Sequence, residues 1–136
     1  SSDTNVLKAV EAGNCSLTVV NTYYLARLIE NNSAENLGIF WANQEDRGVH
    51  VNISGAGLVK WSNNKNSSIQ LLEWLSSDTA QEMYAKANKE YPTVDGIPLH
   101  PLIEAWGDFK EDLIQVDKLG LMQSDAVFIA QTAGYN

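Results

Sequence analysis

The hydrophobic pattern of the chain changes at residues 19–25, which read Val19-Val20-Asn21-Thr22-Tyr23-Tyr24-Leu25. The apolar stretch from Cys15 to Val20 predicts a strand that is covered on both faces, as in a parallel or mixed sheet. From Thr22 onward the apolar residues recur at helical spacing, so we expect a helix to begin there. A buried strand, a tight turn and a helix within about twenty residues are typical of the α/β class.

Similar patterns occur in the rest of the chain. Compact or alternating apolar residues predict further strands at residues 38–42, 49–53 and 58–61. Helical spacing, Ser, Thr or Asp start signals and Gly stop signals predict helices at residues 3–12, 22–29, 69–75, 78–87, 102–106, 109–116 and 124–133. We therefore expect a mixed sheet with flanking helices.

The composition excludes several classes of function. The chain has 136 residues and a formal net charge of -8, which does not fit a protein that binds nucleic acid or an anionic membrane. No apolar run approaches the roughly 20 residues that a membrane span needs. Cys15 is the single cysteine, so the chain cannot form an internal disulfide or a paired-cysteine zinc site.

Tyr23 and Tyr24 directly follow the predicted strand and turn. Ligands gather outside the carboxyl ends of strands in open α/β sheets, and the free amides at a helix start favour negative charge. At such a junction two phenol oxygens can reach one point, and Fe(III) can displace their protons because it is a hard, highly charged ion. The pair suggests a ferric site, and packing of two amphipathic side chains is the alternative.

Several short motifs accompany the tyrosine pair in a fixed order. They are Asp3-Thr4, Leu7-Lys8-Ala9-Val10, Ala12-Gly13, Cys15, Val19-Val20-Asn21-Thr22-Tyr23-Tyr24-Leu25, Asn43-Gln44, Arg47-Gly48, His50-Val51-Asn52-Ile53-Ser54-Gly55-Ala56-Gly57, Leu72-Glu73-Trp74-Leu75, Ala80-Gln81, Glu90-Tyr91-Pro92, Trp106-Gly107, Phe109-Lys110 and Ala133-Gly134. Together they resemble the C-terminal half of the periplasmic Fe(III)-binding proteins that feed ABC transporters. The resemblance spans essentially the whole chain.

The resemblance implies a partial class II periplasmic-binding-protein fold, the C-terminal portion of a two-lobed α/β protein that holds iron in its cleft. It implies that Tyr23 and Tyr24 are iron ligands. It also implies that Asn21 helps to bind a synergistic anion such as carbonate or phosphate. The remaining ligands, typically His, Glu or further Tyr, come from the preceding half of the family's chain.

The resemblance also implies a division between lobes. Residues 1–53 would form part of the tyrosine-bearing lobe, residues 54–103 a mainly helical part of the other lobe, and residues 104–136 a return to the first, with the family's first half absent. The implied function is capture of ferric iron in the periplasm and delivery to the permease of an ABC importer, by a protein that is not an enzyme and is monomeric in complete form. Because the chain begins without Met or an apolar leader, we expect that a secretion signal has been removed.

Two other functions are open. The same fold could bind an organic or anionic solute without metal, with the tyrosines as hydrogen-bonding or stacking walls. A small hydrolase would use Ser54 with His50 or His100, but the sequence implies no base and orienting carboxylate around Ser54. The two histidines lack paired ligand spacing and are expected to be structural, Arg47 is expected on the surface, and the acidic residues of 104–117 are expected on a solvated helix face.

Overall fold

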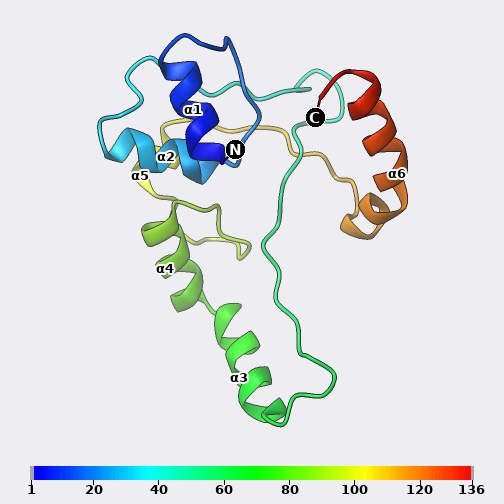
Figure 1. Ribbon diagram of the computed structural model, residues 1–136. Coiled ribbons are helices and arrows are strands. Elements are labelled where there is room, and N and C mark those ends of the chain that lie inside the picture. The colour runs from blue at the N-terminus through cyan, green and yellow to red at the C-terminus, as the bar shows by residue number, and fades with distance from the viewer. Residues whose placement is uncertain (1, 136) are drawn as a thin grey trace. The chain divides into compact units, whose positions relative to one another are not determined.

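The computed structural model describes residues 2–135, and this part of the chain contains six α-helices. They are α1 (Asp3–Glu11), α2 (Thr22–Glu30), α3 (Lys65–Leu75), α4 (Asp78–Asn88), α5 (Pro101–Glu104) and α6 (Val116–Thr132) (Figure 1). The chain divides into two compact units. Unit 1 comprises Ser1–Phe40 and Asn52–Asp108, and unit 2 comprises Trp41–Val51 and Phe109–Asn136.

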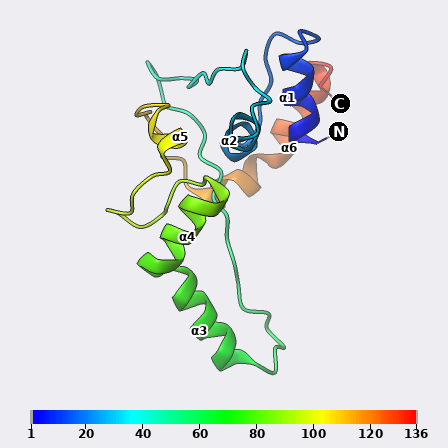
Figure 2. The same ribbon diagram turned by 90° about the vertical axis from the view of Figure 1, so that its left-hand side faces the viewer.

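Local signals position most of the helices where the sequence predicts them. The Ser2 hydroxyl caps α1 by accepting the Asn5 N–H at 3.3 Å, and the Ser77 hydroxyl caps α4 by accepting the Ala80 N–H at 3.4 Å. Each cap satisfies one of the amides that a helix start leaves without a partner. Figure 2 shows α3 followed closely by α4, as expected from the two adjacent helical patterns.

The predicted mixed sheet is not confirmed. Within residues 2–135 no segment forms a strand, and the pairing present is an isolated parallel bridge between Val49 and Glu111. The predicted strand at 15–20 runs as irregular chain, with Leu17 77% and Val19 87% exposed. A strand is held by hydrogen bonds to a neighbouring strand, and the described residues supply no such neighbour for this segment.

The predicted helix at residues 109–116 is wrong. The Val49 N–H donates to the Lys110 carbonyl at 2.9 Å, and the Asp112 N–H donates to the Val49 carbonyl at 2.8 Å. These bonds engage the Lys110 carbonyl and the Asp112 N–H with a distant segment, so these two groups are not available to a helix. The following helix, α6, begins at Val116 and not at the predicted Ser124.

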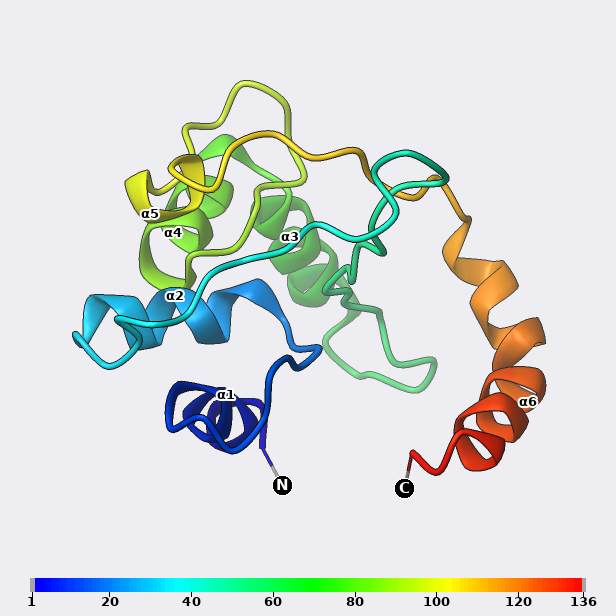
Figure 3. The same ribbon diagram turned by 90° about the horizontal axis from the view of Figure 1, so that it is seen from above.

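The core of unit 1 lies between α1 and α2. Leu7 of α1 and Leu25 and Leu28 of α2 are each 7% exposed or less, and Ala34 joins them. Tyr24 packs against this cluster while remaining partly accessible. Figures 1 and 3 show the two helices side by side. The burial of their leucines therefore determines the orientation of the helix that carries the tyrosine pair.

An ion pair links the end of α2 to the end of α4. The Lys89 ammonium donates to Glu30 Oε2 at 2.7 Å, and the Lys89 side chain is only 9% exposed. Lys89 ends α4 in the left-handed conformation, with φ 60°. The hydrogen bond from Lys89 holds the pKa of the Glu30 carboxyl below its ordinary value.

In unit 2, the loop after Trp41 is held against residues 109–112. The Trp41 and Phe109 rings stack with centroids 4.4 Å apart. The Gln44 side chain accepts the Lys110 N–H at 2.6 Å and donates to the Lys110 carbonyl at 3.0 Å. Arg47 Nε lies 3.2 Å from Asp112 Oδ2, in an ion pair whose arginine is largely exposed.

Within residues 2–135, no helix combines the length and the apolar character that a membrane crossing requires.

Gly48 is expected to tolerate no side chain. Its φ is +100°, and a Cβ there would lie 2.6 Å from backbone atoms of Glu111 and Lys110, which cannot move without breaking the bonds of Val49. Gly48→Ala should lower the free energy of unfolding by about 2–4 kcal/mol, measured by urea denaturation. The control is Gly38→Ala, where a Cβ meets open space. Equal effects of the two substitutions would contradict the prediction.

The Glu30–Lys89 pair predicts a pH-dependent contribution to stability. Because the pKa of Glu30 is lowered in the folded state, its contribution is present above the unfolded value of 4.5 and is lost as the pH falls through the folded value. Glu30→Gln should lower the melting temperature at neutral pH and leave it unchanged at the acid end of this range, in thermal unfolding scans. The control is Glu35→Gln, at an exposed site after the end of α2. Its melting temperature should equal that of the native protein at both neutral and acid pH.

Candidate metal centre

Tyr23 and Tyr24 lie in the first turn of α2. Asn21 precedes the helix in an extended conformation, and its carbonyl accepts the Tyr24 N–H at 3.2 Å. The two rings have centroids 4.5 Å apart and planes tilted by 37°, so they lie against each other and do not diverge as neighbours on a regular helix would. Both side chains are half-buried. The structure therefore brings the two predicted ligand residues together.

The surroundings of Tyr23 disfavour the loss of its phenolic proton. A hydrogen bond to the Tyr24 side chain raises the pKa of Tyr23, and desolvation and the negative charges of Glu90 and Asp3 raise it further. Removing the Tyr23 proton therefore requires a strong positive charge nearby. A trivalent cation bound to the oxygen supplies such a charge.

Arg27 lies beside both rings. Its Cζ is 5.1 Å from the Tyr23 centroid and 5.7 Å from the Tyr24 centroid. The contact follows from helix geometry, because residues three and four positions apart lie on one face. A guanidinium at this distance interacts favourably with the aromatic faces.

Asn21 is held by residues from two other segments. Its backbone N–H and its side-chain amide both lie 3.5 Å from Asp3 Oδ2, and its side-chain carbonyl accepts from Asn52 Nδ2 at 2.9 Å. Asn21 does not cap α2 with its side chain, and the first turn of α2 contains no acidic residue. The carboxylate at this helix start thus comes from α1.

The other candidates lie in structural or exposed positions. His100 caps α5, because its Nδ1 accepts the Leu102 N–H at 3.2 Å. His50 and Ser54 are exposed. Arg47 pairs with Asp112, in agreement with its expected surface position. Among residues 2–135, no three His, Cys, Asp or Glu side chains gather where they could hold a metal ion.

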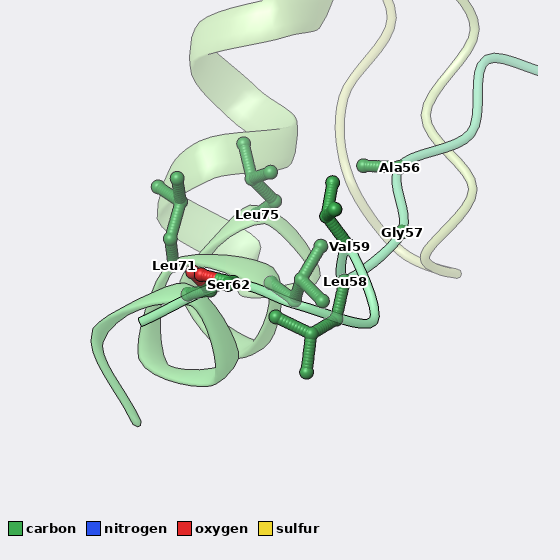
Figure 4. A pocket seen from close by; sticks show the side chains of 9 residues that line it. Ala56, Gly57, Leu58, Val59, Ser62, Leu71 and Leu75 are labelled. Atoms are coloured by element: carbon green, nitrogen blue, oxygen red, sulfur yellow. The ribbon is translucent and has the colours of Figure 1, made fainter. Parts of the chain in front are cut away.

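A separate hollow lies between residues 56–62 and α3 (Figure 4). Its walls are mostly aliphatic, and the polar side chains that line it are Ser62 and Ser68. Such a lining offers neither charge nor good metal ligands, so the tyrosine pair remains the candidate site.

The structure adds three residues that the sequence analysis did not assign to the site: Asp3, Arg27 and Asn52. Arg27 could have been found from its spacing of three and four residues after the tyrosines on a predicted helix. The contacts of Asp3 and Asn52 with Asn21 cross 18 and 31 positions, and no local pattern indicates them.

Known proteins are similar to this chain over nearly its whole length. No family model matches it. Iron uptake protein A1 of Synechocystis sp. is 42% identical over 98% of the chain and 39% of that protein. The Fe(3+)-binding periplasmic protein of Serratia marcescens is 27% identical over 97% of the chain and 39% of that protein.

A solved structure is also similar to this chain. The Trichodesmium protein IdiA (FutA), in complex with iron and citrate ligands, superposes with a TM-score of 0.89 at 39% identity over 100% of this chain and 45% of that one. The present chain therefore spans about two fifths of the length of the curated relatives it matches. Over that span, it is a homologue of the periplasmic ferric iron-binding proteins.

Proposed function

We propose that Tyr23 and Tyr24 bind Fe(III) through their phenolate oxygens in a periplasmic protein that captures ferric iron and delivers it to an ABC importer. The observation that carries this proposal is the contact of the two phenols in the first turn of α2. Homology to ferric iron-binding proteins supports the choice of ion. The protein's work is binding and release, not catalysis.

The chemistry of the pair fits a ferric ion. Phenolate oxygens are hard donors, and a trivalent cation offsets the raised pKa of Tyr23 by binding the deprotonated form. Two phenolates leave one net positive charge on the ion. We propose that further ligands come from the part of the family fold that this chain does not span, since it covers 45% of the matched iron-bound structure.

Delivery requires a change of shape. In the proposed division, residues 1–53 and 104–136 contribute to the tyrosine-bearing lobe and residues 54–103 to the other. Iron bound by the tyrosines would favour closure of the second lobe over it, and the closed form would be the one that the permease recognises. We also propose, from the family resemblance, that the complete protein is a monomer.

Replacing either tyrosine is expected to remove a ligand. Fe(III) added to the protein expressed from its complete gene should give a visible tyrosinate-to-iron charge-transfer band. Tyr23→Phe and Tyr24→Phe should each weaken or shift this band and lower iron affinity, measured by chelator competition, by on the order of a hundredfold. Each substitution removes one oxygen and keeps the ring, so the contact between the two rings and the packing of residue 24 on the leucine cluster are retained.

The matched control is Tyr84→Phe, which changes an exposed tyrosine of α4. It should keep both the band and the affinity. A colourless native protein, or iron binding unchanged in both site variants, would falsify the proposal. Solute binding that persists in all variants without metal would instead favour an organic or anionic ligand.

A further inference from the structure

The Glu30–Lys89 ion pair joins the helix that carries the tyrosines to the end of α4. The two residues are 59 positions apart, and both belong to unit 1. In the proposed division between lobes, Glu30 falls in the tyrosine-bearing lobe and Lys89 falls in the other. The ion pair is therefore a direct link between the two proposed lobes.

The charges of this pair are costly to separate. Glu30 is the last residue of α2, where the helix dipole disfavours a carboxylate, and the Lys89 ammonium at 2.7 Å offsets that cost. The Lys89 side chain is 9% exposed and that of Glu30 is 49% exposed. Separation would leave a buried ammonium without its carboxylate, so the pair is expected to persist when other parts of the protein move.

Lys89 is also the residue at which α4 ends. Its φ of 60° lies in the left-handed region, where a helix end usually has glycine because a side chain is unfavourable there. Lys89 Nζ also donates to the Ala87 carbonyl at 3.4 Å, so one side chain contacts both its own helix and α2. Residues 89–100, which follow, form no helix or strand. Hinges are commonly made by such residues at the end of an element.

The residue after Lys89 lies near the tyrosine pair. The negative charge of Glu90 is one of the causes that raise the pKa of Tyr23, so Glu90 is within electrostatic range of that phenol. The chain leaving α4 thus interacts with α2 twice, through Lys89 at the last residue of α2 and through Glu90 at its first turn. A change in the direction of α4 would act on the surroundings of the tyrosines through this segment.

We propose that Lys89 and Glu30 are positioning residues for iron retention, and that their ion pair is the fixed point about which the second lobe turns when it closes over the ion. This inference rests on the proposed ferric function of Tyr23 and Tyr24. Neither residue of the ion pair acts as an iron ligand. The pair holds the end of α4 in one direction relative to α2, so that closure leads to one closed form.

The expected consequence is kinetic. Iron enters the open cleft before the lobes close, so the rate of capture does not depend on the ion pair. Release requires the second lobe to reopen, and a closed form that has lost its fixed point reopens sooner. Loss of the pair should therefore raise the rate of release and leave the rate of capture unchanged.

The test substitution is Lys89→Met in the protein expressed from its complete gene. It keeps the aliphatic stem and leaves the half-exposed Glu30 in water, whereas a change at Glu30 would leave a buried charge unpaired. The tyrosinate-to-iron band should keep its native wavelength, because the ligands are unchanged. Decay of the band in excess chelator should be about tenfold faster than in the native protein, with capture rates that agree within about twofold. Small-angle X-ray scattering should show less contraction on iron loading than in the native protein.

Two further variants serve as controls. Lys89→Arg keeps the positive charge at the same left-handed position and should release iron at the native rate. Lys86→Met removes an exposed lysine from the last turn of α4 and should also behave as the native protein. The melting temperature of each apo protein is measured as well, because a lysine that only stabilised the fold would change that temperature and not the rate of release.

The outcomes separate the inference from the function on which it rests. Equal release rates, or equal contraction, in Lys89→Met and the native protein overturn the role of the ion pair and leave the ferric function intact. The same conclusion follows if Lys89→Met and Lys86→Met release iron alike. A native protein that shows no band with Fe(III) overturns the ferric function and the inference together.

Discussion

The candidate site depends on the packing of Leu7 against Leu25 and Leu28. These side chains hold α1 against α2 and fix the rotation of α2 about its axis. With the leucines facing α1, Tyr24 lies at the edge of the core and Arg27 projects from the exposed side, against both phenol rings. Large-to-small changes at such buried leucines typically cost about 2–5 kcal/mol. The same packing brings the α1 carboxylate to the start of α2.

Helices were predictable because their signals are local. An Asp or Thr start signal, apolar residues at helical spacing and, for the first helix, a closing glycine are all read within about a dozen positions. These signals position α1 and α4 within one or two residues of the expected limits. The α2 start at Thr22 was found in the same way, and with it the tyrosine pair.

Strands were less predictable than helices. A local apolar pattern can indicate that a segment is suited to a strand, but it does not show whether another segment of the chain is available to pair with it. The segment at 15–20 has a strand-like composition, yet within the described residues it has no neighbour to complete a ladder. At residues 109–116 the opposite occurred: an amphipathic pattern suggested a helix, but the backbone at Lys110 and Asp112 bonds to Val49. Tertiary pairing overrode local propensity at residues 109–116, and the lack of a pairing partner among the described residues left 15–20 irregular.

The candidate site was likewise only partly predictable from local sequence. The tyrosine pair suggested a ferric site and the family resemblance supported it, whereas the Asp3 carboxylate that contacts Asn21 comes from a residue 18 positions away. The anion-binding role of Asn21 came from the resemblance and stays a prediction; the structure shows its backbone N and side-chain Nδ2 3.5 Å from Asp3 Oδ2. What faces Asn21 could be learned only from the packing of the two helices.

The bonds between Gln44 and Lys110 join residues 66 positions apart, and this separation has a consequence for the order of events during synthesis. At the usual pace of translation, several seconds pass between the appearance of Gln44 and that of its partner, on the order of 3–13 s. Throughout that interval the loop after Trp41 has neither its amide partner nor the ring of Phe109 to cover it. A nascent chain paused within this window would lack both the Gln44–Lys110 bonds and the stacking of Trp41 on Phe109, so these contacts of unit 2 can form only after Lys110 has emerged.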